Sequence, residues 1–243
     1  MADPGRTIAL LWGRVAEPKR GPRQAVSVEE IVAAAIRIAD EQELVDVTMR
    51  AVGAELGRTA MSLYTYVVSR DVLIELMYDR AHAEMGEVRP GADWRKAVSR
   101  WCVKLHELYL AHPWLLDVQT ARPTLGPYEQ QVLESLLRIL AAAGLAIDDR
   151  PAVTSALFSI VRGAARQAVD ARAAVTKSDV EWWAARGRAL AEVVPDFAER
   201  FPEATAIAAR QRKHGAQPWV TAADQAFTRG VGLVIAGIDK LRD

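Results

Sequence analysis

The sequence predicts an all-α fold, with a small N-terminal three-helix domain and a larger helical domain. Three observations support this: strand-like alternation of polar and apolar residues is scarce, alanine-rich stretches are long, and 51% of the 243 residues are hydrophobic. A chain of this length and composition can bury a sizeable core. We expect the small domain to span residues 26–86 and the larger one residues 93–243, because the proline- and glycine-containing segment GEVRPGAD lies between them.

The first predicted helix begins at Val28 and runs to about Gln42. Ser27 and Glu30 have the spacing of a capping box, in which each side chain accepts a hydrogen bond from a free amide at the helix start.

Between Thr48 and Ser69, three N-cap residues predict two short helices and the start of a longer one. Thr48 caps the first helix, which Gly57 ends by taking a left-handed conformation, and Thr59 caps the second. Ser69 caps the third, which continues past Met77. Two short helices that meet at a glycine turn, with a support helix before them, are typical of a helix-turn-helix. The sequence therefore predicts a DNA-binding domain.

The second short helix is the expected major-groove reader. Its first turn carries small side chains that can approach base edges, and the two tyrosines that follow can hydrogen-bond phosphates. The expected DNA-binding residues of the segment are Thr48, Arg50, Arg58, Thr59, Ala60, Met61, Ser62, Tyr64, Tyr66 and Arg70, with Arg58 and Arg70 as phosphate contacts. The alternative is an ordinary helical hairpin in which Tyr64 and Tyr66 are half-buried packing residues.

Residues 1–25 form a predicted basic N-terminal arm. Five basic side chains and one acidic side chain lie in residues 5–25, whereas Lys+Arg and Asp+Glu both total 31 in the whole chain. Attraction to DNA must therefore come from the placement of charge, and the arm concentrates positive charge. We expect Lys19, Arg20 and Arg23 to contact DNA, with the arm extended in a minor groove. The alternative is a disordered tail with no specific role.

The larger domain is predicted to contain six helices. Asp93 caps a helix that runs to about Ala111, and Pro113 begins a short one. The others are expected over Tyr128–Ala143, from about Asp149 to Ala173, over Asp179–Val193 and from about Ala222 to Leu241.

The larger domain is also expected to enclose a ligand cavity, because aromatic and polar side chains lie on helices that surround a common interior. The expected lining residues are Trp101, His106, Tyr109, Trp114, Gln119, Phe158, Arg162 and Trp182. For each residue taken singly, the alternative is a core or surface position unconnected with a ligand.

Two helices of the larger domain are apolar on more than one side, and such a helix needs more than one partner. They are the helix over residues 152–173 and the last helix. We expect them to form a homodimer interface through Ala156, Gly163, Ala164, Phe227, Val231, Val234, Ile235 and Ile238. The alternative is that both helices fill the core of the monomer.

Catalysis, metal binding and membrane insertion find no support in the sequence. The four histidines are scattered, without partner cysteines at metal-binding spacing, and no nucleophile elbow or phosphate-binding loop is present. We therefore expect no enzyme activity, no metal and no cofactor. The single Cys102 excludes an intramolecular disulfide and no apolar run reaches about 20 residues, which together favour a cytoplasmic protein.

The segment from Val26 to about Met85 resembles the tetracycline-repressor (TetR/AcrR) family of bacterial transcription regulators. The stretches VEEIVAAAIRIAD, VTMRAVGAELG, MSLYTYV and SRDVLIELM are similar to the family's pattern in order and spacing. This chain departs from the pattern in three places. The family usually has a glycine after its first helix, where this chain has Gln42, Glu43 and Leu44, so the resemblance implies that a non-glycine residue takes a left-handed conformation there, at a cost of about 1 kcal/mol. The other two departures are Arg58, where the family commonly has valine, and Arg70, where a lysine is usual. The resemblance implies a homodimer that binds a double-stranded DNA operator, with the last two long helices as its interface and a small-molecule inducer in the larger domain.

Together these features predict a ligand-responsive homodimeric repressor that a small molecule releases from a pseudopalindromic operator. Ligand binding is expected to shift the helix that follows Ser69 through its contact with the helix that follows Asp93. Two alternatives stay open: a constitutive DNA-binding dimer without an inducer, and a helical ligand-binding protein or enzyme that does not bind DNA.

Overall fold

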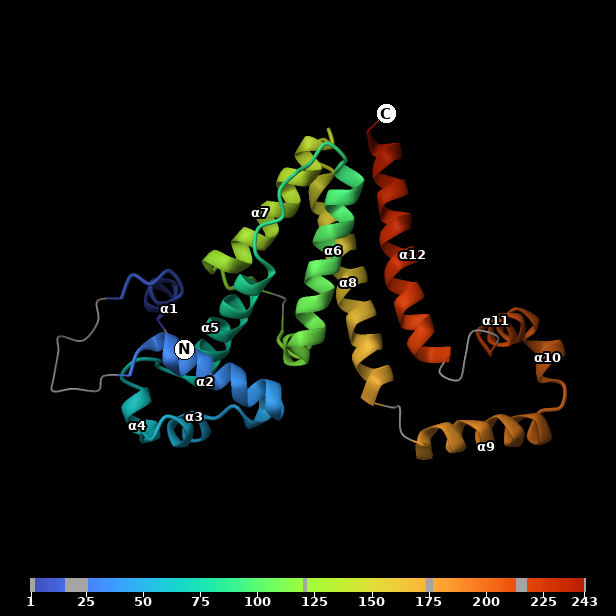
Figure 1. Cartoon of the computed structure of the whole chain (residues 1–243), viewed down its shortest axis with the longest axis horizontal. Helices are drawn as coiled ribbons and strands as arrows, with labels where there is room; N and C mark the ends of the chain where they lie inside the picture. The colour runs from blue at the N-terminus through green and yellow to red at the C-terminus, as the bar shows by residue number, and fades with distance from the viewer. Residues whose placement is uncertain (1–2, 16–25, 120–121, 174–176, 213–217, 243) are drawn as a thin grey trace.

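The structure is a computed structural model that describes residues 3–15, 26–119, 122–173, 177–212 and 218–242. Every regular element in these ranges is a helix, which confirms the predicted all-α fold. Figure 1 shows three parts: an N-terminal group of short helices, a tall stack of longer helices and a smaller group that projects from the far side of the stack.

The N-terminal group is built around the predicted support helix. It consists of α2 (Val28–Glu41), η1 (Leu44–Asp46), α3 (Met49–Glu55), α4 (Ala60–Leu63) and α5 (Arg70–His82). The apolar faces of these helices meet in a core where Ile31, Val52, Leu63 and Leu73 have no exposed surface. Burial of such side chains is the main force that holds short helices of this length together.

The helix starts in this group follow the predicted caps. Ser27 Oγ accepts a hydrogen bond from the Glu30 amide at 3.1 Å, and Glu30 Oε2 accepts one from the Ser27 amide at 2.8 Å, which completes the capping box. The side chains of Thr48, Thr59 and Ser69 each accept from the amide three residues further on.

The predicted left-handed residue after α2 is wrong. Gln42 has a φ of −128°, and Leu125 is the only non-glycine residue with a positive φ in the described part of the chain. The turn closes through η1 instead. Arg70 of α5 donates to the carbonyls of Leu44 and Val47, both at 2.6 Å, and so satisfies the backbone of a turn that has no glycine.

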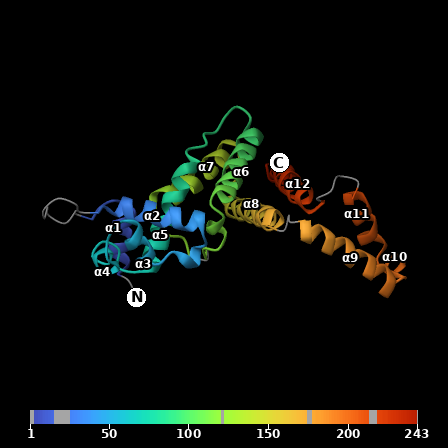
Figure 2. The same cartoon turned by 60° about the horizontal axis from the view of Figure 1, so that its bottom comes forward.

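The central stack contains the longer helices. They are η2 (Ala83–Met85), α6 (Trp94–Ala111), η3 (Pro113–Leu116), α7 (Pro127–Ala142), α8 (Arg150–Ala173) and α12 (Pro218–Leu241). α8 packs on α6 on one side and along α12 on the other, as Figures 1 and 2 show from two directions. The stack joins the N-terminal group chiefly where α5 packs against α7.

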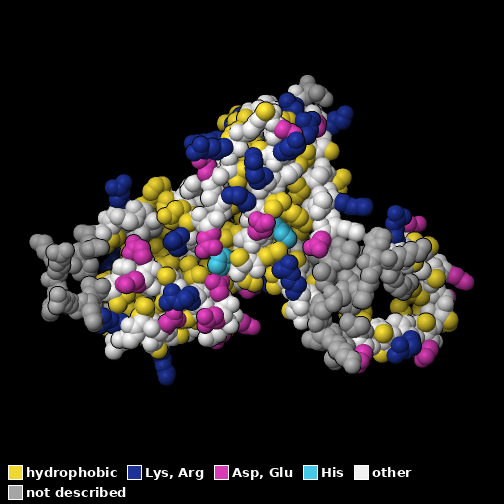
Figure 3. All heavy atoms as spheres, viewed as in Figure 1, with side chains coloured by type: hydrophobic (Ala, Val, Ile, Leu, Met, Phe, Trp, Pro, Cys, Tyr) yellow, Lys and Arg dark blue, Asp and Glu magenta, His cyan; other side chains and the backbone are white. Residues whose placement is uncertain are grey.

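The third part is formed by α9 (Lys177–Val193), α10 (Phe197–Arg200) and α11 (Pro202–Arg212), of which only α9 was predicted. It projects away from α8 in both views. Its aromatic side chains are largely exposed, and Trp182 has 53% of its surface accessible. In the space-filling view, apolar atoms are visible on this part as they are on the stack and the N-terminal group, with acidic and basic side chains interspersed among them (Figure 3).

The chain begins with a helix that the sequence did not predict. α1 (Pro4–Leu11) starts at Asp3, whose carboxylate accepts from the Gly5 amide at 3.1 Å. It packs on α5 with Leu10 and Leu11 buried. The apolar residues near Ile8, which did not fit a polar arm, therefore belong to an amphipathic helix. Within the described ranges, no helix combines the length and the apolar character that crossing a bilayer requires.

Candidate functional site

The junction between α3 and α4 has the tight geometry of a helix-turn-helix. Gly57 has a φ of +65°, which favours glycine, and the Arg58 amide donates to the Gly53 carbonyl at 2.7 Å. A Cβ atom on Gly53 would lie 2.8 Å from the Arg58 carbonyl oxygen. The two helices can therefore approach this closely only with glycine at position 53.

α4 is buried on one side and exposed to solvent on the other. Leu63 is fully buried, whereas Met61 is 76% exposed and Tyr64 is also exposed. The other predicted contacts on this face are exposed or half-buried, and they are Thr48, Arg50, Arg58, Thr59, Ala60, Ser62 and Tyr66. Ser62 Oγ donates to the Thr59 carbonyl at 2.7 Å. These predicted reader residues thus keep accessible surface, although Ala60 and Tyr66 also pack against the hydrophobic core.

Arg70 is placed otherwise than predicted, and three further predicted DNA contacts lie outside the described residues. Arg70 was predicted as a phosphate contact, but its guanidinium is half-buried and donates to backbone carbonyls of the turn after α2. There it satisfies the backbone carbonyls of a turn that has no glycine. Lys19, Arg20 and Arg23 of the predicted arm lie outside the described residues.

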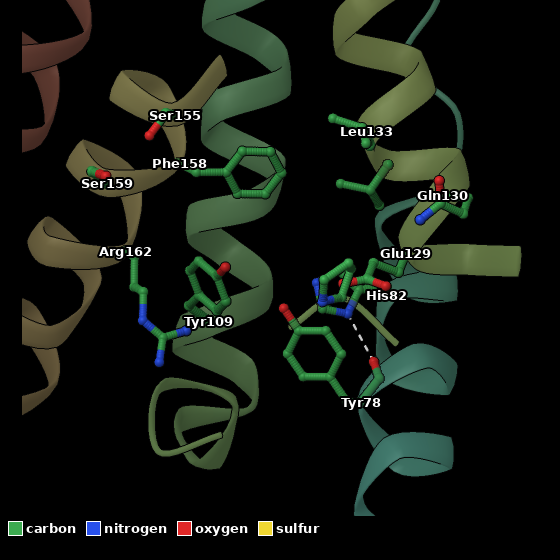
Figure 4. Close-up of a pocket in the computed structure, with 12 residues that line it drawn as sticks. Tyr78, His82, Tyr109, Glu129, Gln130, Leu133, Ser155, Phe158, Ser159 and Arg162 are labelled. Carbon is green, nitrogen blue, oxygen red and sulfur yellow. Dashed lines mark hydrogen bonds between the residues drawn. The ribbon is translucent and has the colours of Figure 1, made fainter. Parts of the chain in front are cut away.

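A cavity of about 360 Å³ opens between α5, α6, α7 and α8 (Figure 4). Its walls combine aromatic rings with a few polar groups, a composition typical of small-molecule sites. The lining residues are Tyr78, His82, Tyr109, Pro123, Glu129, Gln130, Val132, Leu133, Ser155, Phe158, Ser159 and Arg162. Figure 4 shows the labelled residues on four helices around the cavity.

Three of the eight predicted lining residues reach this cavity: Tyr109, Phe158 and Arg162. The fully buried Trp101 stands behind the wall, with its ring edge-on to Phe158 and its Nε1 donating to the Val132 carbonyl. The other four lie away from it. His106 stacks on Phe227 of α12, Trp114 hydrogen-bonds Asp40, Gln119 is exposed, and Trp182 is on α9.

The sequence analysis missed the part of the wall that α5 and α7 supply. Tyr78 and His82 are one turn apart on α5, and their spacing places both on the same helix face. That spacing was the available signal. It was missed because α5 was assigned to the DNA-binding domain alone.

Burial sets the electrostatics of the α5 wall. It raises the pKa of the Tyr78 and Tyr109 hydroxyls, which therefore stay protonated, and it lowers the pKa of His82, which stays neutral at pH 7. His82 Nδ1 lies 2.7 Å from the Tyr78 carbonyl, an acceptor, so the ring proton is on Nδ1 and Nε2 is left as an acceptor.

Asp79, between these residues, joins α5 to α7. Its carboxylate is buried and accepts hydrogen bonds from the amides of Tyr128 and Glu129, at 3.0 and 2.9 Å, at the start of α7. Burial raises the pKa of this carboxyl to about 6, although the two amides favour its charged form. A Cβ atom on Gly126 would lie 2.2 Å from Asp79 Oδ1. The contact between α5 and α7 is thus very close.

A family model described as the C-terminal domain of tetracyclin repressor-like proteins matches residues 88–242, more than half of the chain. This chain belongs to the tetracycline-repressor family. It is a TetR-type DNA-binding transcriptional repressor and not an enzyme, as the sequence predicted.

Relatives of this TetR-family chain cover both of its domains. It is 36% identical to the HTH-type transcriptional repressor DrrR1 of Streptomyces coeruleorubidus, over 79% of this chain and 73% of the relative. The structure is similar to apo ActR of Streptomyces coelicolor, with a TM-score of 0.71, 25% identity and coverage of 88% and 95% of the two chains. ActR in complex with (S)-DNPA gives a TM-score of 0.68 at 25% identity, over 88% and 98%.

A second contact joins the N-terminal group of helices to the central stack of this TetR-family chain. His112, at the end of α6, lies between Asp40 of α2 at 2.7 Å and Glu84 of η2 at 3.0 Å. Burial lowers the pKa of His112, but the hydrogen bonds that its ring donates to Glu84 and Asp40 outweigh this effect, so the net pKa is raised. Trp114 Nε1 also donates to Asp40 at 2.8 Å. Both α2 and α5 are therefore joined by hydrogen bonds to the central stack, which contains the cavity.

The predicted interface residues of the TetR-family chain fall into two groups. Ala164, Val231 and Ile238 are buried within one chain, where α12 packs along α8. Phe227, Val234 and Ile235 are half-buried against the same core. Gly163 is exposed and Ala156 half-exposed, and Leu233, which was not predicted, is 74% exposed. The two helices thus fill part of the monomer core and also leave an open apolar face.

Proposed function

We propose that this chain is a ligand-responsive homodimeric repressor that a small molecule releases from a pseudopalindromic operator. One observation carries the proposal: α5 runs from the end of the helix-turn-helix to the cavity. It begins at Arg70, close behind the reader helix α4, and twelve residues later His82 lines the cavity. A helix moves nearly as a rigid body, so a ligand that displaces its C-terminal half also reorients α4.

The structure supports a route through α7 rather than the predicted one through α6. Glu129 and Gln130 of α7 line the cavity, and the start of the same helix is hydrogen-bonded to Asp79 of α5. Arg162 supports a second route. Its guanidinium lines the cavity and donates to the carbonyls of Leu115, Leu116 and Val118, next to the Trp114 that holds α2.

The proposed DNA contacts are those on the open face of α4 and at its flanks. Met61 and Ala60 offer no hydrogen bonds to base edges, so Thr59, Ser62, Tyr64 and Tyr66 would supply the specific contacts. Arg50 and Arg58 would bind phosphates. Lys19, Arg20 and Arg23 are proposed as additional contacts from the arm.

A dimer is typical of the TetR family, and the open face of α8 and α12 supports one here. Leu233, Gly163 and Ala156 offer an apolar surface with little relief, which two copies can cover by a two-fold axis. Two-fold symmetry also places two α4 helices on successive turns of a pseudopalindromic site. Since genomic DNA is the partner, we place the protein in the cytoplasm.

We infer that the ligand is a planar aromatic compound that carries hydroxyl groups. Tyr78, Tyr109 and Phe158 supply flat apolar surfaces, and the neutral His82 offers Nε2 to a hydroxyl donor. The ActR relative has been solved with (S)-DNPA. A 360 Å³ cavity has room for a compound of a few fused rings.

The test is a footprint on the DNA that flanks the gene, repeated with a panel of hydroxylated aromatic compounds and their O-methyl ethers. We expect a protected pseudopalindrome that at least one free hydroxyl compound releases, while its ether does not. The same compound should raise the melting temperature of the wild-type protein but not of His82→Leu. Protection that no compound in the panel alters would favour a constitutive DNA-binding dimer.

A further inference from the structure

The N-terminal helix α1 contacts a segment beside each of the two candidate sites. At its start, Arg6 Nη2 donates to the Thr65 carbonyl at 3.0 Å, immediately after the reader helix α4. Just beyond its end, Trp12 Nε1 donates to the Leu125 carbonyl at 3.0 Å, in the segment that leads into α7. These two carbonyls belong to separate domains and are 60 residues apart in the chain.

α1 is built to hold these ends at a fixed distance. Its N-cap Asp3 accepts from Gly5, and Thr7, Leu10 and Leu11 are buried where the helix packs on α5. An eight-residue helix is about 12 Å long and resists stretching, because each turn is closed by backbone hydrogen bonds. Figures 1 and 2 both place α1 beside α5, at the edge of the N-terminal group.

The Leu125 end is connected directly to the cavity wall. Glu129, which lines the cavity, accepts from Thr124 Oγ1 at 2.8 Å and from the Leu125 amide at 3.0 Å. Leu125 has a φ of +60°, which is strained for a branched side chain and persists only where its surroundings hold it. Any displacement of Glu129 therefore changes a backbone segment that Trp12 also holds.

We propose that α1 is a strap between the pocket and the reader, in which Trp12 and Arg6 are the positioning residues. A change at Glu129 passes to the Leu125 segment, through Trp12 to α1, and through Arg6 to the turn that ends α4. α1, with Arg6 and Trp12, lies outside residues 88–242, which the family model matches, and the route does not run along α5 as the one proposed above does. It concerns the free protein, so its failure is distinguishable from failure of the ligand proposal.

The test is hydrogen exchange on the full-length protein without ligand or DNA. Trp12→Phe keeps an aromatic ring but removes the donor to Leu125, and Arg6→Met keeps a long side chain but removes the donor to Thr65. We expect each variant to speed exchange roughly fivefold at both ends, in residues 64–67 and in residues 122–129. The reciprocal effect is the signature, because a merely local role would loosen only the nearer end.

Two control variants match the chemical changes. Arg14→Met removes the same charge three residues beyond α1, and Trp182→Phe makes the same indole replacement on the distant α9. Neither should alter exchange at residues 64–67 or 122–129. The strap proposal is overturned if Trp12→Phe and Arg6→Met each affect only their own end, if neither affects exchange, or if the controls have the same effect.

Discussion

At the scale of single residues, His112 gives the protein a proton-dependent contact between its domains. Both ring nitrogens face carboxylates, so the doubly protonated ring fits the site best. Its pKa is raised in the folded state, so its stabilising effect is complete below about pH 6.5, the ordinary value, and is lost as pH rises through the folded-state pKa. We expect His112→Gln to cost about 1 to 3 kcal/mol at pH 6 and less at pH 8.5, measured by denaturant unfolding at fixed protein concentration.

His106→Gln is the matched control for this measurement. Burial lowers the pKa of His106, so in the wild type this residue favours unfolding as pH falls below about 6.5. Its replacement should therefore change the pH dependence of the free energy of unfolding in the direction opposite to that of His112→Gln. Equal and pH-independent losses in the two variants would contradict the proposed ionic contact at His112.

At the scale of elements, the angle between α3 and α4 depends on one glycine. Gly53→Ala forces its Cβ against the Arg58 carbonyl, and backbone cannot move aside as a flexible side chain can. We expect the free energy of unfolding to fall by about 1 to 3 kcal/mol, measured by thermal unfolding. The operator affinity should fall by a larger proportion, measured by DNA titration. Gly187→Ala in α9, where a Cβ meets open space, should leave affinity unchanged and slightly raise stability.

At the scale of the whole molecule, the open face of α8 and α12 decides whether two reading domains act together. Leu233→Glu places a charge at an exposed position of α12, and we expect a monomer in sedimentation analysis and an operator affinity lowered at least about 100-fold. Ile147→Glu, equally exposed but in the turn between α7 and α8, should remain a dimer. A Leu233→Glu protein that stays dimeric would place the interface elsewhere.

The sequence predicts elements that depend on residues close together in the chain. It does not predict contacts between residues that are far apart in the chain. The caps at Ser27, Thr48 and Thr59 involve residues three positions apart, so the helix-turn-helix could be read directly. The role of Arg70 could not, because its carbonyl partners lie 23 and 26 residues earlier. The same reason explains the cavity: Tyr78 becomes a wall residue only because α7 and α8 cover it.

The close contact between Gly126 and Asp79 separates positions that can vary during evolution from a position that cannot. Any side chain at position 126 would collide with the carboxylate that joins α5 to α7, so the entry to α7 tolerates little substitution. Gln130, Ser155 and Ser159 carry no such constraint, and they line the same cavity. New ligand preferences should therefore arise first at these three positions, with the inherited link to the DNA reader left intact.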